Sequence, residues 1–322
     1  MNKDLIIDAG KTGVEIALLE DKRLVELHQG NSESTHLVGD IYLGQVKKLL
    51  PGLNAAFIDV GSKKDGFLHY LDLGLYYKAL EKFTKICMSG GGDSMDFAKL
   101  KEPKLEKSGK IVETLKQGQV ILVQVSKEAI STKGPRLCTE ISFAGRYLVL
   151  VPFSEKVSVS QKIKSAEERN RLRKLIKSIK PDNFGIIIRT IAEGKSVAEL
   201  DADLKDLLSK WESIKKKLPK ALPPTKLVSE LDKSSVILRD MLTEEFNNVY
   251  VNDADLYEEL KGYISSICPE KEDILHLYKM QTPIFEQFGV ASQIRNSFGK
   301  VVTIRSGIYL IIEQTEAMHV ID

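Results

Sequence analysis

The chain has 322 residues, of which 43% are hydrophobic and 29% are charged, a composition that excludes fibrous and largely disordered chains. This length can form roughly two or three domains with their own hydrophobic cores. The formal net charge is only +2, so local charge must decide what the protein binds. Its three cysteines are far apart, the start is polar, and no apolar run approaches the ~20 residues that cross a bilayer. These features predict a cytoplasmic protein without disulfides or a zinc site.

The chain opens with an antiparallel meander of three predicted strands, at residues 5–9, 13–19 and 23–28. The first turn, Gly10-Lys11-Thr12, has the composition of a phosphate-binding loop. That motif needs a glycine five residues before its Gly–Lys pair and a helix after it, whereas Leu5 stands there and a strand follows. The run Gly194-Lys195-Ser196 fails in the same way, because Arg189 occupies the position of the first glycine. Neither run therefore supports a phosphate-binding metabolic enzyme.

Residues 36–145 are rich in short strands, predicted at 39–46, 53–61, 65–69 and 119–125. Phe57 and Phe67 fall on neighbouring strands, and Lys133 lies in the loop after the last one. The lysines that flank the two rings are Lys47, Lys48, Lys63 and Lys64. Aromatic rings with cations at their edges are typical of OB-type barrels that hold single-stranded nucleic acid. An ordinary core role for each Phe is the alternative.

A lysine-rich insertion, residues 71–117, interrupts this segment. Its Gly/Ser run at 89–94 predicts a mobile surface loop with no chemistry of its own.

From residue 146 the pattern changes to alternating strands and helices. Strands are predicted at 147–152 and 185–190, a basic helix at 167–179, and a long helix that begins at the capping box of Ser196 and Glu199. Arg189 and Thr190 end a buried strand just before a helix, where a guanidinium and a hydroxyl can bind a phosphate. An ion pair of Arg189 with a nearby carboxylate remains an equal alternative.

The last third begins after the linker at 222–225. An α/β segment is predicted to pack with residues 1–35, with helices at 235–246, 253–267 and 283–298 and strands at 249–251 and 274–278. Three further strands, at 300–305, 307–313 and 317–322, predict a new sheet, and their abrupt end at Asp322 predicts a truncated domain.

The sequence resembles the bacterial RNase E/G endoribonucleases over essentially its whole length. The resemblance is carried by IYLG at 41–44, AAFIDVG at 55–61, GFL at 66–68, KG at 133–134, ISFAGRYLVL at 141–150, IRT at 188–190 and EQTEA at 313–317, followed by Asp322. Each motif is weak alone, and their order and spacing together are specific.

The resemblance implies a multi-domain α+β protein. It has an RNase H-like α/β domain of residues 1–35 and 233–297 without catalytic residues. Inserted into that domain are an OB-fold RNA-binding domain, 36–140, and a 5′-sensor, 141–232, that prefers RNA with a 5′ monophosphate. Residues 298–322 would begin a DNase I-like catalytic domain. The implied partner is single-stranded RNA, and the full-length family implies a homo-oligomer joined by structural Zn²⁺.

The resemblance also assigns roles to single residues. The RNA-contacting positions are Phe57, Phe67 and Lys133. The 5′-phosphate site would contain Arg189 and Thr190 as ligands, Gly145 and Val149 as backbone and wall, and Lys162 in place of an arginine that relatives carry. Asp322 would be one of two aspartates that bind the Mg²⁺ which activates water for attack on the phosphodiester.

Two functions follow from these assignments. The first is a Mg²⁺-dependent, single-strand-specific endoribonuclease of RNA processing and decay, whose binding elements and first metal ligand lie in this chain. The second is a non-catalytic module that binds single-stranded RNA, because the second aspartate and the zinc ligands are absent from this sequence.

Overall fold

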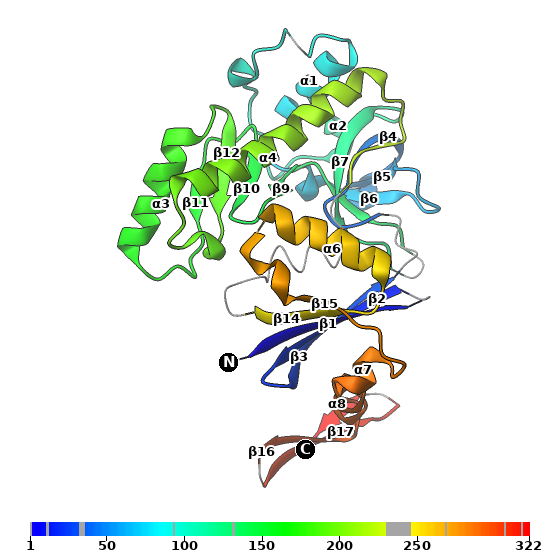
Figure 1. Cartoon of the computed structure of the whole chain (residues 1–322). Coiled ribbons are helices and arrows are strands. Elements are labelled where there is room, and N and C mark those ends of the chain that lie inside the picture. Colours follow the sequence, from blue (N-terminus) through cyan, green and yellow to red (C-terminus); the bar gives the residue numbers. More distant parts are fainter. Residues whose placement is uncertain are drawn as a thin grey trace. The chain divides into compact units, whose positions relative to one another are not determined.

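The computed structural model shows a mixed α+β protein (Figure 1). The structure describes residues 2–10, 13–31, 36–92, 94–130, 133–229, 246–267, 269–305, 307–316 and 318–322. The chain divides into two compact units, one of Met1–Glu33 with Lys233–Asp322 and one of Ser34–Asp232.

The first unit is built on a five-stranded sheet in the order β15-β14-β1-β2-β3. Its strands are β1 (Lys3–Gly10), β2 (Gly13–Glu20), β3 (Arg23–Asn31), β14 (Phe246–Val251) and β15 (Leu275–Leu277). The first three form the predicted antiparallel meander, and β14 and β15 run parallel to β1. Alternate residues of each strand point to opposite faces of a sheet, so both faces of β1 can be buried. Leu5 and Ile7 pack with helix α6 (Ala254–Ile267), and Ile6 packs with the helices that follow β15.

One helix of this unit differs from its prediction. The expected helix at 283–298 is two short helices, α7 (Ile284–Gln287) and α8 (Val290–Ser297). Gly289 separates them with a φ of 69°, a left-handed conformation that ends a helix and suits glycine. The predicted helix at 235–246 lies outside the described residues up to 245, and Phe246 begins β14.

The end of the chain forms a separate antiparallel sheet, as the sequence predicts. Its strands are β16 (Val301–Arg305), β17 (Ile308–Gln314) and β18 (His319–Ile321), and their side chains are mostly exposed.

The second unit contains a closed five-stranded barrel, consistent with an OB fold. Its strands are β4 (Ile41–Leu50), β5 (Ala55–Asp59), β6 (Gly66–His69), β8 (Arg136–Cys138) and β7 (Val120–Lys127), and the pairing of β4 with β7 closes it. The barrel interior includes Ile58, Leu68 and Leu137. Gly66 is required where β6 meets β8, because a Cβ there would lie 2.4 Å from a methyl carbon of Leu137. A further strand, β13 (Thr225–Val228), pairs with β4.

The lysine-rich insertion contributes to the core on both sides of the Gly/Ser run for which a surface loop was predicted. Helix α1 (Tyr77–Met88) buries Phe83, whose ring stacks on Trp211 with centroids 4.5 Å apart. Further along, Phe97 stacks on Phe184 at 4.7 Å. Even within the Gly/Ser run, Gly92 is buried. The insertion also contains the short helix α2 (Ile111–Thr114).

A second sheet of this unit has the order β11-β12-β10-β9. Its strands are β9 (Phe143–Ala144), β10 (Leu148–Pro152), β11 (Val157–Val159) and β12 (Phe184–Ile188). Helices α3 (Ala166–Ile179) and α4 (Val197–Lys217) lie next to this sheet (Figure 1). Their buried side chains share a core with Leu148 and Leu150 of β10. The capping box of Ser196 and Glu199 begins α4, as predicted.

Candidate functional site

Phe57 and Phe67 lie opposite each other on the outer surface of the barrel. They are register partners on β5 and β6. Their ring centroids are 6.1 Å apart and their planes meet at 68°, an edge-to-face arrangement. Both residues are partly exposed, whereas Ala56, Ile58 and Leu68 beside them are buried in the barrel. The two rings therefore form an aromatic surface that faces away from the barrel core.

The lysines that flank these rings differ in their surroundings. Lys48 is exposed and is the register partner of Phe57. Lys47 lies at a β-bulge, with its Nζ 2.8 Å from Asp65 Oδ1 and 3.2 Å from Asp59 Oδ2. Hydrogen bonds to Asp65 and then Asp59 raise the pKa of Lys47. The remaining two, Lys63 and Lys64, are exposed in the turn before β6.

The loop that carries Lys133 runs directly against this surface. The carbonyl of Pro135 accepts a hydrogen bond of 2.8 Å from the N–H of Phe67. A Cβ at Gly134 would lie 2.1 Å from the carbonyl oxygen of Asp65, so only glycine allows this approach. Lys133 is exposed next to that glycine, which places a cation on the β6 side of the aromatic surface.

A second group of predicted residues meets at one end of the sheet, where β12 leads into a 3-10 turn, η4 (Thr190–Ala192). The hydroxyl oxygens of Ser160 and Thr190 are 2.9 Å apart, and the N–H of Lys162 donates to Ser160 Oγ at 3.3 Å. Arg189 is partly exposed and donates from Nη1 to the carbonyl oxygen of Gly145 at 2.8 Å. The structure thus brings the Thr190 and Ser160 hydroxyls together, while the guanidinium of the neighbouring Arg189 is held by Gly145; hydroxyl and guanidinium groups are both able to bind a phosphate.

Asp203 of α4 holds the turn that leads from Gly145 into β10. Its carboxylate accepts hydrogen bonds from the backbone N–H groups of Arg146 at 3.0 Å and of Tyr147 and Leu148 at 2.9 Å each. Burial raises the pKa of Asp203, and the three backbone donors oppose that rise. A Cβ at Gly145 would lie 2.6 Å from both carboxylate oxygens, so glycine is needed there. This turn also supplies the carbonyl oxygen of Gly145, which accepts the hydrogen bond from Arg189.

The basic helix α3 contributes an ion pair that fixes the loop after Thr190. Arg171 donates two hydrogen bonds of 2.6 Å to the carboxylate of Glu168, which also accepts the N–H of Gly194 at 2.9 Å. Hydrogen bonds from Arg171 and then Gly194 lower the pKa of Glu168 to about 2. Arg171 also donates to the carbonyl of Lys195 at 3.0 Å. Arg171 of the basic helix therefore has a structural role. Lys162, which precedes this helix in the chain, is exposed beside Ser160.

Val149 is a partly exposed residue of β10. It pairs with Ile187 of β12 and with Ala144 of β9. Val149 and Ile187 line a cavity of about 430 Å³, together with Tyr76 from the start of the insertion. The structure therefore places Val149 in a separate, mostly apolar hollow that neither Arg189 nor Thr190 lines.

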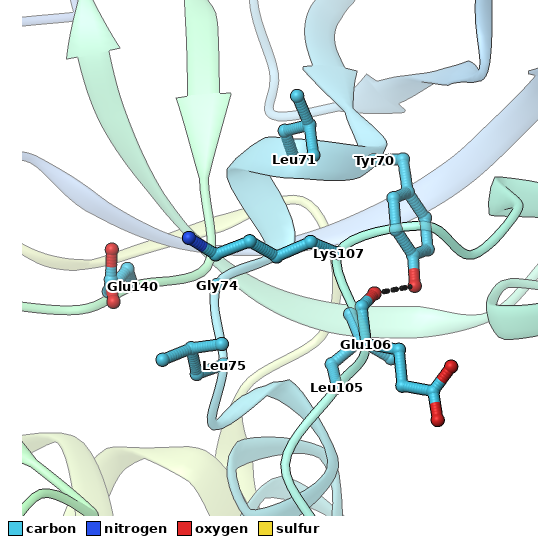
Figure 2. A pocket seen from close by; sticks show the side chains of 8 residues that line it. All are labelled: Tyr70, Leu71, Gly74, Leu75, Leu105, Glu106, Lys107 and Glu140. Atoms are coloured by element: carbon cyan, nitrogen blue, oxygen red, sulfur yellow. Dashed lines mark hydrogen bonds between the residues drawn. The ribbon is translucent and has the colours of Figure 1, made fainter.

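Another cavity, of about 390 Å³, lies between the turn after β6 and residues 105–107 (Figure 2). Tyr70 forms one wall and donates a hydrogen bond of 2.5 Å to the carbonyl oxygen of Glu106. The residues that the sequence predicts for binding lie elsewhere. Its lining carries two carboxylates, Glu106 and Glu140, against one cation, Lys107, so it has no excess of positive charge for a phosphate.

Asp322 follows β18 and still pairs with β17, exchanging backbone hydrogen bonds of 2.9 Å with Ile311. Its side chain is exposed. Among the described residues, no group of three or more His, Cys, Asp or Glu side chains is placed to hold a metal ion. One exposed carboxylate does not make a magnesium site, because Mg²⁺ demands near-octahedral oxygen coordination. The described residues therefore do not fit this ion by themselves.

The two described cysteines offer no zinc site either. Cys87 is buried and Cys138 is partly exposed. Burial raises the pKa of Cys138 to about 11, which disfavours the thiolate that zinc requires.

In the parts of the chain that the structure describes, no helix combines the length and apolar character needed to cross a membrane.

Two contributors were missed from the sequence, Ser160 and Asp203. Asp203 had a readable signal, since it lies on the same helical side as the buried residues Leu200, Leu204 and Leu207. Ser160 had none, because its hydroxyl meets that of Thr190 only when β11 and β12 are side by side.

Comparisons with known proteins match between about half of this chain and all of it. A model of the Ribonuclease E/G family matches residues 142–322. Ribonuclease G of Haemophilus influenzae is 35% identical over 319 residues, which are 99% of this chain and 61% of that protein. Ribonuclease G of Escherichia coli K12 is 34% identical over 100% of this chain and 62% of its own length. Ribonuclease E of Nostoc is 37% identical over 292 residues, 89% of this chain and 39% of that protein. The chain thus spans less than two thirds of these relatives.

Proposed function

Because the chain belongs to the Ribonuclease E/G family, we propose that it is the RNA-binding portion of an endoribonuclease that cuts single-stranded RNA. The observation that carries this proposal is the pair of partly exposed rings on the outside of the barrel, Phe57 and Phe67. Bases stack on such rings while nearby cations contact phosphates. Residues 36–140 would then be the OB-fold RNA-binding domain.

Binding of a labelled single-stranded oligoribonucleotide, followed by fluorescence anisotropy, tests this proposal. Each stacked base contributes about 1–3 kcal/mol, so we expect Phe57→Ala and Phe67→Ala each to weaken binding roughly 5- to 150-fold. Phe298→Ala is the matched control, since this phenylalanine is 85% exposed and lies in the other unit. Equal affinity of all three variants and the wild type would refute the proposal.

We further propose that residues 141–232 sense the 5′ end of the RNA. The arrangement of Arg189, Thr190 and Ser160 supports a site for a 5′ monophosphate, with Lys162 adding charge and Gly145 positioning Arg189. Val149 would contact the first base. Lys162 lacks the planar fork of the arginine in relatives, so it would act as a point charge.

The sensor is tested with two oligonucleotides that differ only in a 5′ monophosphate or 5′ hydroxyl. Thr190→Val keeps the shape and removes the hydroxyl, which costs about 1.5–3 kcal/mol for a hydrogen bond to a charged group, roughly 10- to 150-fold. This loss is expected only with the monophosphate. Ser178→Ala, which removes an exposed hydroxyl on α3, serves as the control. A wild type that binds both ends equally contradicts the sensor.

For catalysis, we propose that Asp322 is one ligand of a Mg²⁺ ion and that residues beyond this sequence complete its site. The 61–62% coverage of the Ribonuclease G relatives supports this, as does the lack of a metal-binding cluster in the described residues. We also propose that the zinc ligands lie beyond this sequence and that the full-length protein assembles into a homo-oligomer. The RNase H-like part would be formed by residues 1–35 with 233–297. The DNase I-like part would be formed by residues 298–322. A cytoplasmic location stays a prediction.

The alternative is a non-catalytic RNA-binding module. Incubating this chain, and a version extended past residue 322, with single-stranded RNA and Mg²⁺ separates the two. The endoribonuclease proposal expects cleavage by the extended protein that is lost in Asp322→Asn. Binding without cleavage by the extended protein would leave only the module.

A further inference from the structure

The two phenylalanines belong to a longer row of side chains on the outer surface of the barrel. Lys48 pairs with Phe57 between β4 and β5, Phe57 with Phe67 between β5 and β6, and Phe67 with Arg136 between β6 and β8. Arg136 then pairs with Lys127 between β8 and β7. Register partners on adjacent strands project from the same face of a sheet. The row therefore crosses all five strands, with the two rings inside and a cation or two on each side.

Two β-bulges bring the lysines into this row. On β4 the register shifts between Val46 and Lys48, and on β7 it shifts between Val125 and Lys127. Val46 and Val125 are buried in the barrel. One extra residue in a strand changes which face the following side chains take. Lys48 and Lys127 are accordingly exposed, and within the described part of the chain neither makes an ion pair.

Arg136 is held in a fixed orientation beside Phe67. Its Nε donates to Asp72 Oδ2 at 2.9 Å and its Nη2 to Asp72 Oδ1 at 3.1 Å, a two-pronged ion pair. The arginine side chain keeps 43% of its surface exposed. A planar guanidinium held by one edge still offers its faces for stacking and its remaining N–H groups for a phosphate.

Resting on the proposed RNA-binding function, we infer that single-stranded RNA crosses the strands along this row. Bases stack on Phe57 and Phe67, and Lys48, Arg136 and Lys127 contact the flanking phosphates. Strands lie 4.7–4.9 Å apart, so the path from Lys48 to Lys127 along the curved surface of the barrel is about 19 Å long. Lys47 is outside this contact set, because the β-bulge leaves it without a register partner on β5.

The salt dependence of binding tests the row directly. Each phosphate contact on a single strand contributes about 0.7 to the slope of log K against log salt concentration. With the full chain and a 5′-hydroxyl, 3′-fluorescein single-stranded RNA, Lys48→Ala and Lys127→Ala should each lower that slope by about 0.7. The double variant should lower it by about 1.4. Lys205→Ala is the matched control, since this exposed lysine of α4 pairs with Asp201 and its loss also removes one charge.

Arg136 needs a readout that separates binding from its ion pair with Asp72. Arg136→Ala should lower the slope by about 0.7, whereas Arg136→Lys keeps the charge and should keep the slope. A purely structural arginine would instead lower the melting temperature of Arg136→Ala without moving the slope.

The outcomes distinguish the row from the proposed function. If the lysine variants behave as Lys205→Ala while Phe57→Ala and Phe67→Ala still weaken binding, the row is wrong and the aromatic surface stands. If the phenylalanine variants bind as the wild type does, both are overturned.

Discussion

Replacing Asp203 by alanine is expected to damage both the fold and the phosphate site of the second unit. The substitution removes the acceptor of three backbone N–H groups, those of Arg146, Tyr147 and Leu148. Each donor left without its partner costs about 1–3 kcal/mol. Because Asp203 itself is only partly buried and water can replace some of these bonds, we take the low end, about 3 kcal/mol in total.

At roughly 2–4 °C per kcal/mol for a unit of this size, the melting temperature should fall by about 6–12 °C. The turn also carries the carbonyl of Gly145 that orients Arg189, so the preference for a 5′ monophosphate should disappear. Affinity for 5′-hydroxyl RNA should persist, because the barrel surface is untouched.

The assay combines thermal unfolding with anisotropy on the two oligonucleotides. Asp206→Ala is the control, since this aspartate lies on the same helix and is exposed. The reasoning would be refuted if Asp203→Ala had the same melting temperature as Asp206→Ala, or if it retained the preference for a 5′ monophosphate.

Three further predictions concern stability. Gly134→Ala places a Cβ 2.1 Å from a backbone oxygen and should cost about 1–3 kcal/mol, whereas Gly52→Ala, with nothing within 4 Å, should not; urea unfolding compares them. Trp211→Ala removes the ring on which the insertion packs and should cost about 3–5 kcal/mol in the same experiment, and a loss below 1 kcal/mol would contradict its place in the core. Glu168→Gln should lower the melting temperature at neutral pH by the few degrees of a surface ion pair, about 1 kcal/mol or less. Because the folded pKa of Glu168 is lowered to about 2 from 4.5, this difference should be full above pH 4.5 and vanish as pH falls toward 2; a difference independent of pH would rule out the ion pair as its cause.

Local patterns in the sequence predict most strands and the paired rings, because period-two alternation and turn residues are properties of neighbouring positions. The same patterns mark Phe57 and Phe67 but cannot show that β-bulges bring Lys48 and Lys127 into their row. That depends on pairing between strands far apart in the chain.

Other features were missed for identifiable reasons. The many lysines of the insertion suggest an exposed segment, so the buried side of helix α1, which includes Phe83, was not predicted. The single helix predicted at 283–298 includes Gly289, whose left-handed conformation divides that helix in two. The helical pattern places Asp203 on the buried side of α4, but its hydrogen-bond partners lie more than 50 residues away in sequence, so the pattern does not identify them.

The most direct test of the account is to locate bound RNA on the protein. A single-stranded oligoribonucleotide with 4-thiouridine at each uridine would be bound to the full chain, irradiated and digested, and the cross-linked peptides identified by mass spectrometry. We predict cross-links in the peptides that contain Phe57 and Phe67, reduced in the double alanine variant. Cross-links confined to residues 246–322 would contradict the account.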